Sequence, residues 1–258
     1  IIDIKNIFEK DISIQEKIAS QTDSVIKVYD FFFDSARNLM FALLEKGSKD
    51  VTLENILSEN ELYSLPEKIR LLKKIALSIK DVHSLGYIHG DIKPRNILFG
   101  EDSKMGQETL GGKDFLIIKG NPKLTDFGSA LPINAENPTE NIIGTPEFLC
   151  PDKLRSETVD PRWDIFSLGV MAYYMLFGRF PFHTSFTSGI YHFRESPPNL
   201  NLGREYWPMT NPIKRMLSLK PGSDYEPDIR YRSIEELIKD LEFAEKYFSE
   251  EKIFTLGR

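Results

Sequence analysis

One polar stretch, His89-Gly90-Asp91-Ile92-Lys93-Pro94-Arg95-Asn96, is the densest cluster of polar side chains in the sequence. It lies between a segment of helical period and the apolar run Ile97-Leu98-Phe99, which predicts a loop between a helix and a strand. A second cluster, Asp126-Phe127-Gly128, follows the short run Lys123-Leu124-Thr125, so an acidic side chain is expected at the end of a strand. Either cluster alone could be an ordinary loop in which Asp and Asn form turns and caps. The combination of the two favours a functional site.

Asn96 and Asp126 would each place an oxygen donor on one of these loops. Mg²⁺ prefers oxygen ligands and takes the rest of its coordination from the phosphate oxygens of a substrate. Asp91 would then be free to orient an attacking hydroxyl group, and Lys93 to neutralise charge on the phosphoryl group being transferred. The pattern predicts Asp91, Lys93, Asn96 and Asp126 as catalytic residues, with Asn96 and Asp126 also acting as metal ligands.

The composition predicts a folded protein with no nucleic-acid or membrane partner. Of the 258 residues, 41% are hydrophobic and 28% are charged, which is ordinary for a folded domain. The 39 acidic residues outnumber the 33 basic ones, giving a net charge of -6, so no global basic field attracts an anionic polymer or surface. A single cysteine, Cys150, excludes an intramolecular disulfide and a cysteine-rich zinc site, and favours a reducing, cytoplasmic location. The apolar runs are far shorter than the roughly 20 residues of a membrane-spanning helix.

The first 45 residues predict a sheet-rich part of the molecule. Strands are expected at residues 1–4, 25–33 and 39–44, with one helical stretch at residues 8–19. The polar residues 45–48 form a connector of the kind that lets two lobes move against each other.

From residue 52 onward the apolar residues step by three and four, which predicts helices. We expect a long helix before the catalytic cluster and further helices at residues 165–177, 212–219 and 233–248. The glycine-containing residues 100–113 are interpreted as a mobile loop inserted between strands at residues 97–99 and 115–119.

The two polar clusters resemble the catalytic and magnesium-binding loops of eukaryotic-type protein kinases, whose signatures include H-R-D-x-x-x-x-N and D-F-G. Further matches follow in the family's order. Residues 144–152 resemble the end of a kinase activation segment, residues 164–169 the start of the central helix, and residues 176–182 the exit of that helix. Arg230-Tyr231-Arg232-Ser233 is similar to the late arginine motif. The resemblance implies an α+β, bilobal fold, with residues 1–45 as a partial β-rich N-lobe and residues 46–258 as the hinge and a mainly helical C-lobe.

The resemblance also implies an activity. Lys93, followed by Pro94, is similar to serine/threonine kinases, and Thr145 supports this because a threonine there borders the catalytic Asp and Lys in the family. The expected reaction transfers the γ-phosphoryl group of ATP to Ser or Thr hydroxyls of a protein, with Mg²⁺ as the metal. The oligomeric state is not predicted.

The N-terminal site residues follow from the resemblance alone. Ile2-Asp3-Ile4-Lys5 is similar to the V-A-I-K strand, which would make Lys5 the phosphate-bridging lysine. Its helix partner would be Glu16, with Glu9 as the other option. Glu45 to Gly47, after the gatekeeper Leu44, would be the hinge that binds adenine, and Leu98 would form the apolar floor under it. No G-x-G-x-x-G occurs, so we interpret the chain, which opens without methionine, as lacking the glycine-rich loop.

Two alternatives stay open. Gly90 replaces the arginine that in many kinases receives a phosphate on the activation segment, and Asp3 replaces a small apolar residue. A pseudokinase that binds partners without catalysis is therefore one alternative. The second alternative is a small-molecule phosphotransferase of the aminoglycoside or choline kinase type, because the His-Gly-Asp motif also resembles that group.

Several residues have structural interpretations. We expect His89 and Phe127 to pack against each other, Asp164 to accept hydrogen bonds from the catalytic-loop backbone, and Arg230 to pair with Asp152. Cys150 is interpreted as a small packed residue. Ser129 and Thr139 are interpreted as loop hydroxyls and not as switch sites.

Overall fold

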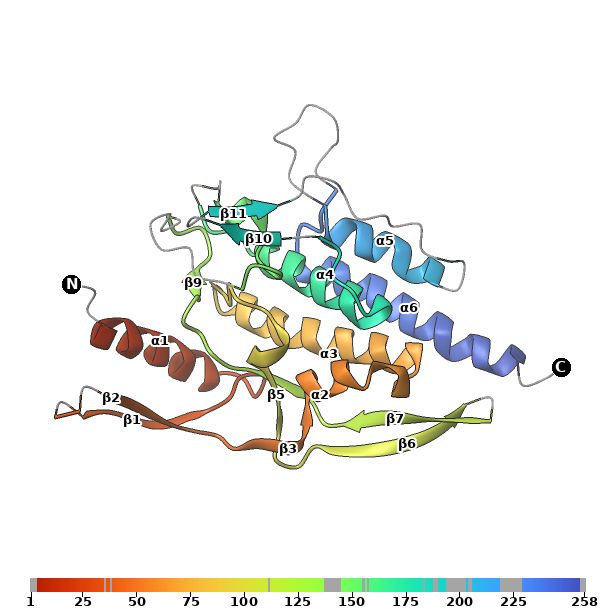
Figure 1. The fold of residues 1–258 in the computed structure, drawn as a ribbon, viewed down its shortest axis with the longest axis horizontal. Helices are drawn as coiled ribbons and strands as arrows, with labels where there is room; N and C mark the ends of the chain where they lie inside the picture. The colour runs from red at the N-terminus through yellow and green to blue at the C-terminus, as the bar shows by residue number, and fades with distance from the viewer. Residues whose placement is uncertain are drawn as a thin grey trace.

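The protein is described by a computed structural model (Figure 1). The described residues are 4–34, 36–37, 39–110, 112–136, 145–154, 156, 158–182, 184–187, 190–193, 203, 206–218 and 229–255. Thr139 and Gly144 lie outside these ranges. The fold is α+β, with a small sheet-rich part at the N-terminus and a larger helical part, as predicted.

The N-terminal part consists of helix α1 (Ile4–Ala19) and the antiparallel strands β1 (Val28–Asp34) and β2 (Leu39–Leu44). The predicted strands at residues 25–33 and 39–44 are therefore confirmed, apart from a later start of the first. The predicted strand at residues 1–4 is wrong where it can be checked, because Ile4 and Lys5 lie in the first turn of α1. Residues 1–3 lie outside the described residues.

Helix α1 forms because its apolar residues repeat with the period of a helix. The apolar residues Ile12, Ile18 and Ala19 are buried on one face, together with the amide side chain of Gln15. The Gln15 side chain donates a hydrogen bond to the Ile26 carbonyl oxygen (2.9 Å), which ties the helix to the chain leading into β1. A helical pattern of this length outweighs the strand preference of a few β-branched residues at its start.

The two polar clusters of the sequence adjoin a second, three-stranded sheet with the order β3-β5-β8. Its strands are β3 (Gly47–Thr52), β5 (Ile97–Gly100) and β8 (Pro122–Leu124), and both pairings are antiparallel. A short ladder joins β4 (Tyr87–Ile88) to β9 (Leu131–Pro132). The predicted strands flanking the two polar clusters are thus present.

Strands β6 (Lys104–Leu110) and β7 (Lys113–Lys119) form a hairpin where a mobile loop was expected, so the loop prediction for residues 100–113 is wrong over most of its length. Ile118 is buried, and its N–H group donates to the Glu67 carboxylate (2.8 Å). Lys74 donates to the Gly120 carbonyl oxygen (2.7 Å) at the base of the hairpin. The polar residues of β6 have little strand preference of their own, so pairing with the apolar β7 decides their conformation.

The helical part packs around α4, which is buried along nearly its whole length. The predicted helices at residues 165–177, 212–219 and 233–248 are present with shifted ends. Helix α3 packs against both α4 and α6 (Figure 1). The elements of this part are α2 (Leu53–Ser58), η1 (Asn60–Leu62), α3 (Leu65–Ser84), η2 (Pro94–Asn96), η3 (Pro151–Leu154), α4 (Arg162–Phe177), β10 (Thr184–Thr187), β11 (Ile190–Phe193), α5 (Trp207–Met216) and α6 (Ile234–Thr255).

Among the described residues, none of the helices combines the length and the apolar character that crossing a membrane would require.

Candidate active site

Asp91 lies in the loop between β4 and η2, and it is the centre of the site. Its side chain is nearly buried, and its carboxylate pairs with the Lys93 ammonium group. The Asn96 side-chain amide donates to the same carboxylate at 3.2 Å, and the Thr145 backbone N–H donates to its other oxygen at 3.2 Å. The structure therefore brings together Asp91, Lys93 and Asn96, as the sequence predicted, and it places Thr145 beside them through its backbone, as the resemblance implied. These contacts hold the carboxylate in one orientation.

Asp164, at the start of α4, holds the backbone of the loop that carries Asp91. Its carboxylate accepts hydrogen bonds from the backbone N–H groups of His89 and Gly90, both at 2.8 Å, as expected. His83 contributes a third hydrogen bond at 2.9 Å. Burial by itself would raise the pKa of Asp164, but the hydrogen bond and charge of His83, with smaller contributions from His89, hold that pKa below its ordinary value. The charged form of Asp164 is therefore the one that the fold stabilises.

His89 connects the catalytic loop to the second polar cluster. One ring nitrogen accepts the Asp91 backbone N–H (3.3 Å), which assigns the proton to the other nitrogen, where it is donated to the Thr125 carbonyl oxygen (3.0 Å). The ring also packs against Phe127, with 4.7 Å between centroids, as expected. His89 thus fixes the two loops relative to each other.

Gly90 is required by the backbone at this point. Its φ angle is +78°, in the left-handed region that favours glycine. A Cβ atom would also lie 2.4 Å from the Ser129 carbonyl oxygen, which is far inside contact distance. The residue that carries no side chain is therefore the one that lets the catalytic loop approach the chain after Asp126-Phe127-Gly128.

Asn96 and Asp126 come to neighbouring positions because β5 and β8 pair with Ile97 opposite Leu124. The Thr125 N–H donates to the Asn96 carbonyl oxygen at 3.1 Å. The Asn96 amide nitrogen is used by Asp91, which leaves the Asn96 amide oxygen for another ligand. Asp126 is exposed, has a φ angle of +65°, and has no ion-pair partner among the described residues.

The donor set of these two residues fits a hard divalent cation. An amide oxygen and an unpaired carboxylate are the oxygen ligands that Mg²⁺ takes alongside phosphate oxygens. Within the part of the chain that the structure describes, no group of three or more His, Cys, Asp or Glu side chains could hold a metal by itself. The residues therefore suit a metal that is bound together with a phosphate-bearing substrate.

Asp11 of α1 is a site residue that the sequence reasoning missed. A Cβ atom on Gly128 would lie 3.2 Å from its carboxylate, so α1 approaches the site through this side chain. Burial, and then the negative charge of Asp126, raise the pKa of Asp11 to about 6. In the sequence, the signal that could have indicated Asp11 was its position next to Ile12, on the border of the apolar face of the predicted helix.

The predicted pair of Lys5 and Glu16 is wrong. Both residues lie on α1, and their separation of 11 positions corresponds to about 16 Å along a helix axis. Glu16 is exposed, and it lies five positions after Asp11, which is about 140° around the helix. Glu9, the other option, is half-buried. Asp11 is the acid of this helix that lies beside Gly128 of the site.

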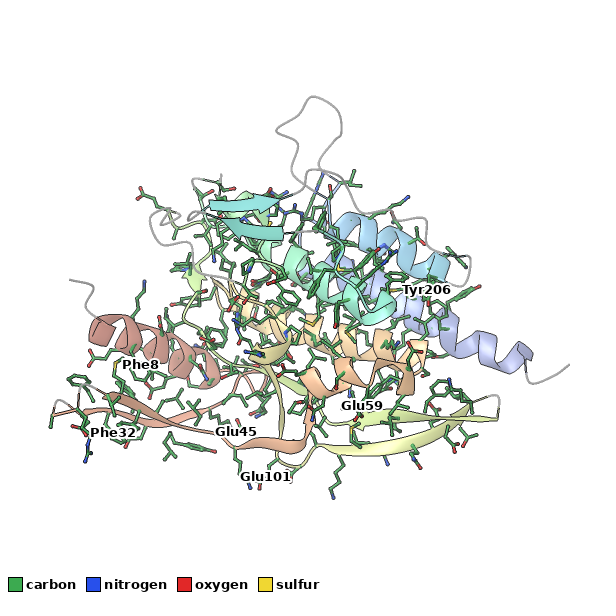
Figure 2. The ribbon with its side chains drawn as sticks, in the orientation of Figure 1. Phe8, Phe32, Glu45, Glu59, Glu101 and Tyr206 are labelled. Carbon is green, nitrogen blue, oxygen red and sulfur yellow. The ribbon has the colours of Figure 1, made fainter. Side chains whose placement is uncertain are left out.

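In the predicted hinge, several polar groups of Glu45 already bond other residues of the protein. Glu45 lies between the β1–β2 hairpin and β3 (Figure 2). Its N–H group donates to the Lys27 carbonyl oxygen (2.8 Å), and its carboxylate accepts from the Lys27 N–H (3.1 Å) and from the Lys123 ammonium group (2.7 Å). Gly47 lies beside Leu98, since a Cβ atom on Gly47 would be 3.9 Å from that side chain. The structure thus brings Gly47 and Leu98 together, while the Glu45 side chain points into an ion pair.

A buried ion pair supports the far side of the site. The Arg230 guanidinium group donates to the Asp152 carboxylate at 2.9 Å, as expected, and to the Ser218 carbonyl oxygen at 2.8 Å. Cys150 is buried beside this pair, and burial raises the pKa of its thiol to about 12. Cys150 is therefore a packed residue, as the sequence indicated.

A carboxylate fixed beside a lysine, with two oxygen donors nearby that suit Mg²⁺, on an α+β fold with a sheet-rich and a helical part, is typical of phosphotransferases of the protein kinase class. The chain belongs to the protein kinase family, because the family model for the protein kinase domain matches residues 3–222.

The curated relatives that we compared are serine/threonine-protein kinases. A probable serine/threonine-protein kinase of Clostridium acetobutylicum is 26% identical over 255 residues, covering 96% of this chain and 35% of the relative. A probable serine/threonine-protein kinase of Clostridium perfringens is 27% identical over 202 residues, covering 76% and 26%. The mouse serine/threonine-protein kinase D3 is 33% identical over 146 residues, covering 56% and 15%. The chain thus spans about a third or less of the length of these relatives.

Proposed function

We propose that this chain is the catalytic domain of an ATP- and Mg²⁺-dependent serine/threonine protein kinase. The observation that carries the proposal is the Asp91 carboxylate, which is held by Lys93, Asn96 and the Thr145 backbone. Asp126 follows Thr125, whose N–H group bonds the Asn96 carbonyl oxygen, and it has no ion-pair partner within the described part of the chain. Such an arrangement supplies what phosphoryl transfer asks of a protein, which is positioning and charge neutralisation with little covalent chemistry.

In the proposed reaction, Asp91 accepts a hydrogen bond from the Ser or Thr hydroxyl group and takes its proton as the hydroxyl oxygen attacks the γ-phosphorus of ATP. Lys93, which neighbours Asp91, neutralises charge on the phosphoryl group during transfer. Asn96 and Asp126 hold Mg²⁺, which would neutralise phosphate charge when it is bound with ATP. The bond between the γ-phosphorus and its bridging oxygen breaks, and ADP leaves with the electron pair.

The adenine site is proposed at the juxtaposed Gly47 and Leu98, with the backbone of Glu45 to Gly47 supplying polar contacts. Leu98 is half-buried and provides an apolar surface for one face of the base. Asp11 replaces Glu16 as the acid of α1 that we propose faces this site. Lys5 is not retained as the lysine that bridges two phosphates, because that role was inferred from a strand that the structure replaces with a helix.

The preference for serine and threonine is inferred from Lys93-Pro94 and from the similarity to serine/threonine-protein kinases. The substrate is proposed to be a protein. A cytoplasmic location stays a prediction from the single cysteine.

The rival is a pseudokinase that binds nucleotide or a partner without transferring phosphate. Gly90 favours it, because many kinases carry at this position an arginine that receives a phosphate on the activation segment. The four residues of the transfer site favour the enzyme.

The deciding experiment measures transfer of labelled γ-phosphate from ATP to a generic basic protein. The full-length protein is compared with the variants Asp91→Asn, Asp126→Asn and, as a matched control, Asp102→Asn, whose side chain is exposed after β5. We expect transfer by the wild type and the control only.

A thermal shift assay with ATP and Mg²⁺ accompanies the transfer assay, because a bound ligand stabilises the folded state. We expect Asp126→Asn to lose the Mg²⁺-dependent part of the shift. A wild type that binds ATP but transfers no more phosphate than Asp91→Asn would contradict the catalytic proposal and support the pseudokinase.

A further inference from the structure

Lys153 of η3 is a lysine in an unusual place. Only 5% of its surface is exposed, although lysine is almost never fully buried unless its charge is compensated. Its ammonium group donates a hydrogen bond to the Gly90 carbonyl oxygen at 3.1 Å. Element η3 comes after Thr145 in the chain, whereas Gly90 precedes Asp91 in the catalytic loop. The contact therefore joins two segments that both reach the active site.

The carbonyl group that Lys153 holds belongs to the peptide unit that carries Asp91. The C=O group of Gly90 and the N–H group of Asp91 lie in one plane, because the peptide bond does not rotate. That N–H group donates to the His89 ring (3.3 Å). Lys153 and His89 therefore bond the two opposite edges of one peptide group, its C=O group and its N–H group. The orientation of this plane sets the direction in which the Asp91 side chain leaves the backbone.

Gly90 contributes no side chain that could hold the plane. Its left-handed φ angle and its closeness to the Ser129 backbone exclude any other residue without rearrangement. Its N–H group is held by Asp164 at 2.8 Å, so both polar groups of Gly90 are fixed by ionisable side chains from other elements. One comes from the start of α4 and the other from η3.

The charges around Lys153 fit this arrangement. Burial lowers the pKa of the Lys153 ammonium group, while the negative charges of Asp164 and then Asp91 oppose that effect. The cation is therefore balanced by a supporting carboxylate and by the carboxylate of the site. A buried charge is expensive compared with an apolar side chain of similar size, so its presence here indicates a local role and not a gain in packing.

We propose that Lys153 is a positioning residue of the active site, which orients the Gly90–Asp91 peptide and thereby aims the Asp91 carboxylate at the acceptor hydroxyl group. The inference rests on the proposed kinase function for its catalytic consequence. It adds a tie between η3 and the catalytic loop that is built entirely from side chains and backbone of the chain itself.

The test compares three variants by steady-state phosphate transfer. Lys153→Met keeps the length of the side chain and removes its donor and charge, and Lys153→Arg keeps both. The matched control is Lys74→Met, because Lys74 also donates to a glycine carbonyl oxygen and also has a pKa lowered by burial, but at the β6–β7 hairpin.

We expect Lys153→Met to lower kcat by roughly 10- to 100-fold, the size of effect that a misplaced catalytic group produces. KM for ATP should stay within about twofold of the wild-type value, because Lys153 orients Asp91, which contacts the acceptor hydroxyl group and not the nucleotide. Lys153→Arg should restore most of kcat, and Lys74→Met should leave both constants near the wild type. Equal losses in Lys153→Met and Lys74→Met, or a loss that appears only in KM, would overturn the inference.

Hydrogen–deuterium exchange of peptides covering residues 89–93 gives a readout that does not depend on activity. Loss of a hydrogen bond to a charged donor should speed exchange of this segment roughly tenfold or more in Lys153→Met, and not in Lys74→Met. If Lys153→Met does not fold, Lys153→Gln replaces it, because it keeps a donor of shorter reach and removes the charge. Unchanged exchange refutes the role of Lys153, whereas absence of phosphate transfer by the wild type refutes the proposed function.

Discussion

Replacing Arg230 with methionine should destabilise the protein more than replacing any exposed arginine. The Arg230 side chain is 2% exposed, and it bonds the Asp152 carboxylate at 2.9 Å and the Ser218 carbonyl oxygen at 2.8 Å. Without Arg230, Asp152 becomes a buried charge with its guanidinium partner removed. Breaking a buried pair in this way costs about 3–5 kcal/mol. For a chain of this size, that corresponds to a loss of roughly 6–20 °C in Tm.

The assay is urea unfolding followed by circular dichroism, together with a thermal melt. Arg95→Met is the matched control, because Arg95 and Glu54 form an ion pair at 3.5 Å with side chains that are 77% and 63% exposed. An exposed pair contributes about 0–1 kcal/mol, so this variant should unfold close to the wild type. The double variant Arg230→Met/Asp152→Leu should recover much of the loss, since it removes the uncompensated charge. If Arg230→Met costs no more than Arg95→Met, the account of this buried pair is wrong.

Three further predictions concern the site and its surroundings. Cys150, whose buried thiol has a pKa raised to about 12, should resist iodoacetamide at mildly alkaline pH in the folded protein and react after unfolding; mass spectrometry that finds labelling of the native state would contradict this. The pKa of Asp164 is held below its ordinary 3.8, so its contribution to stability is present in full above that pH and lost as the pH falls through the folded value. The Tm of the wild type should therefore fall more steeply below pH 3.8 than that of Asp164→Asn, and parallel acid profiles would count against the charged form. Gly90→Ala should lower kcat sharply and reduce Tm, because its Cβ atom meets the Ser129 carbonyl oxygen at 2.4 Å; a fully active alanine variant would show that the loop adapts freely.

The catalytic loop was predictable from the sequence because its chemistry is local. Asp91, Lys93 and Asn96 lie within six residues of each other, so one loop brings all three together. The neighbouring position of Asp126 was also predictable, since each polar cluster adjoins a predicted strand. Their supports, Asp164 and Arg230, were found through the family resemblance and are confirmed by hydrogen bonds in the structure.

The N-terminal predictions failed where short patterns were ambiguous. Four residues rich in isoleucine suit a strand or the first turn of a helix, and only the longer period of α1 decides between them. The same uncertainty in register led to Glu16 instead of Asp11. The prediction of a mobile loop at residues 100–113 failed for a different reason. Strand β6 gains its conformation from pairing with β7, and the hairpin is held by hydrogen bonds to Glu67 and Lys74 of α3.

The sequence by itself determined the class of the fold and the residues of the two polar clusters, His89 to Asn96 and Asp126 to Gly128, to which we assign catalysis and metal binding. These features depend on residue types at short, fixed separations. Only the tertiary structure decided that Asp11 is the helix acid facing the site, that residues 104–119 form a hairpin, and that Lys153 reaches the Gly90 carbonyl oxygen. Each of these depends on contact between segments that are distant in the chain, and such contacts are set by packing, which a single sequence does not display.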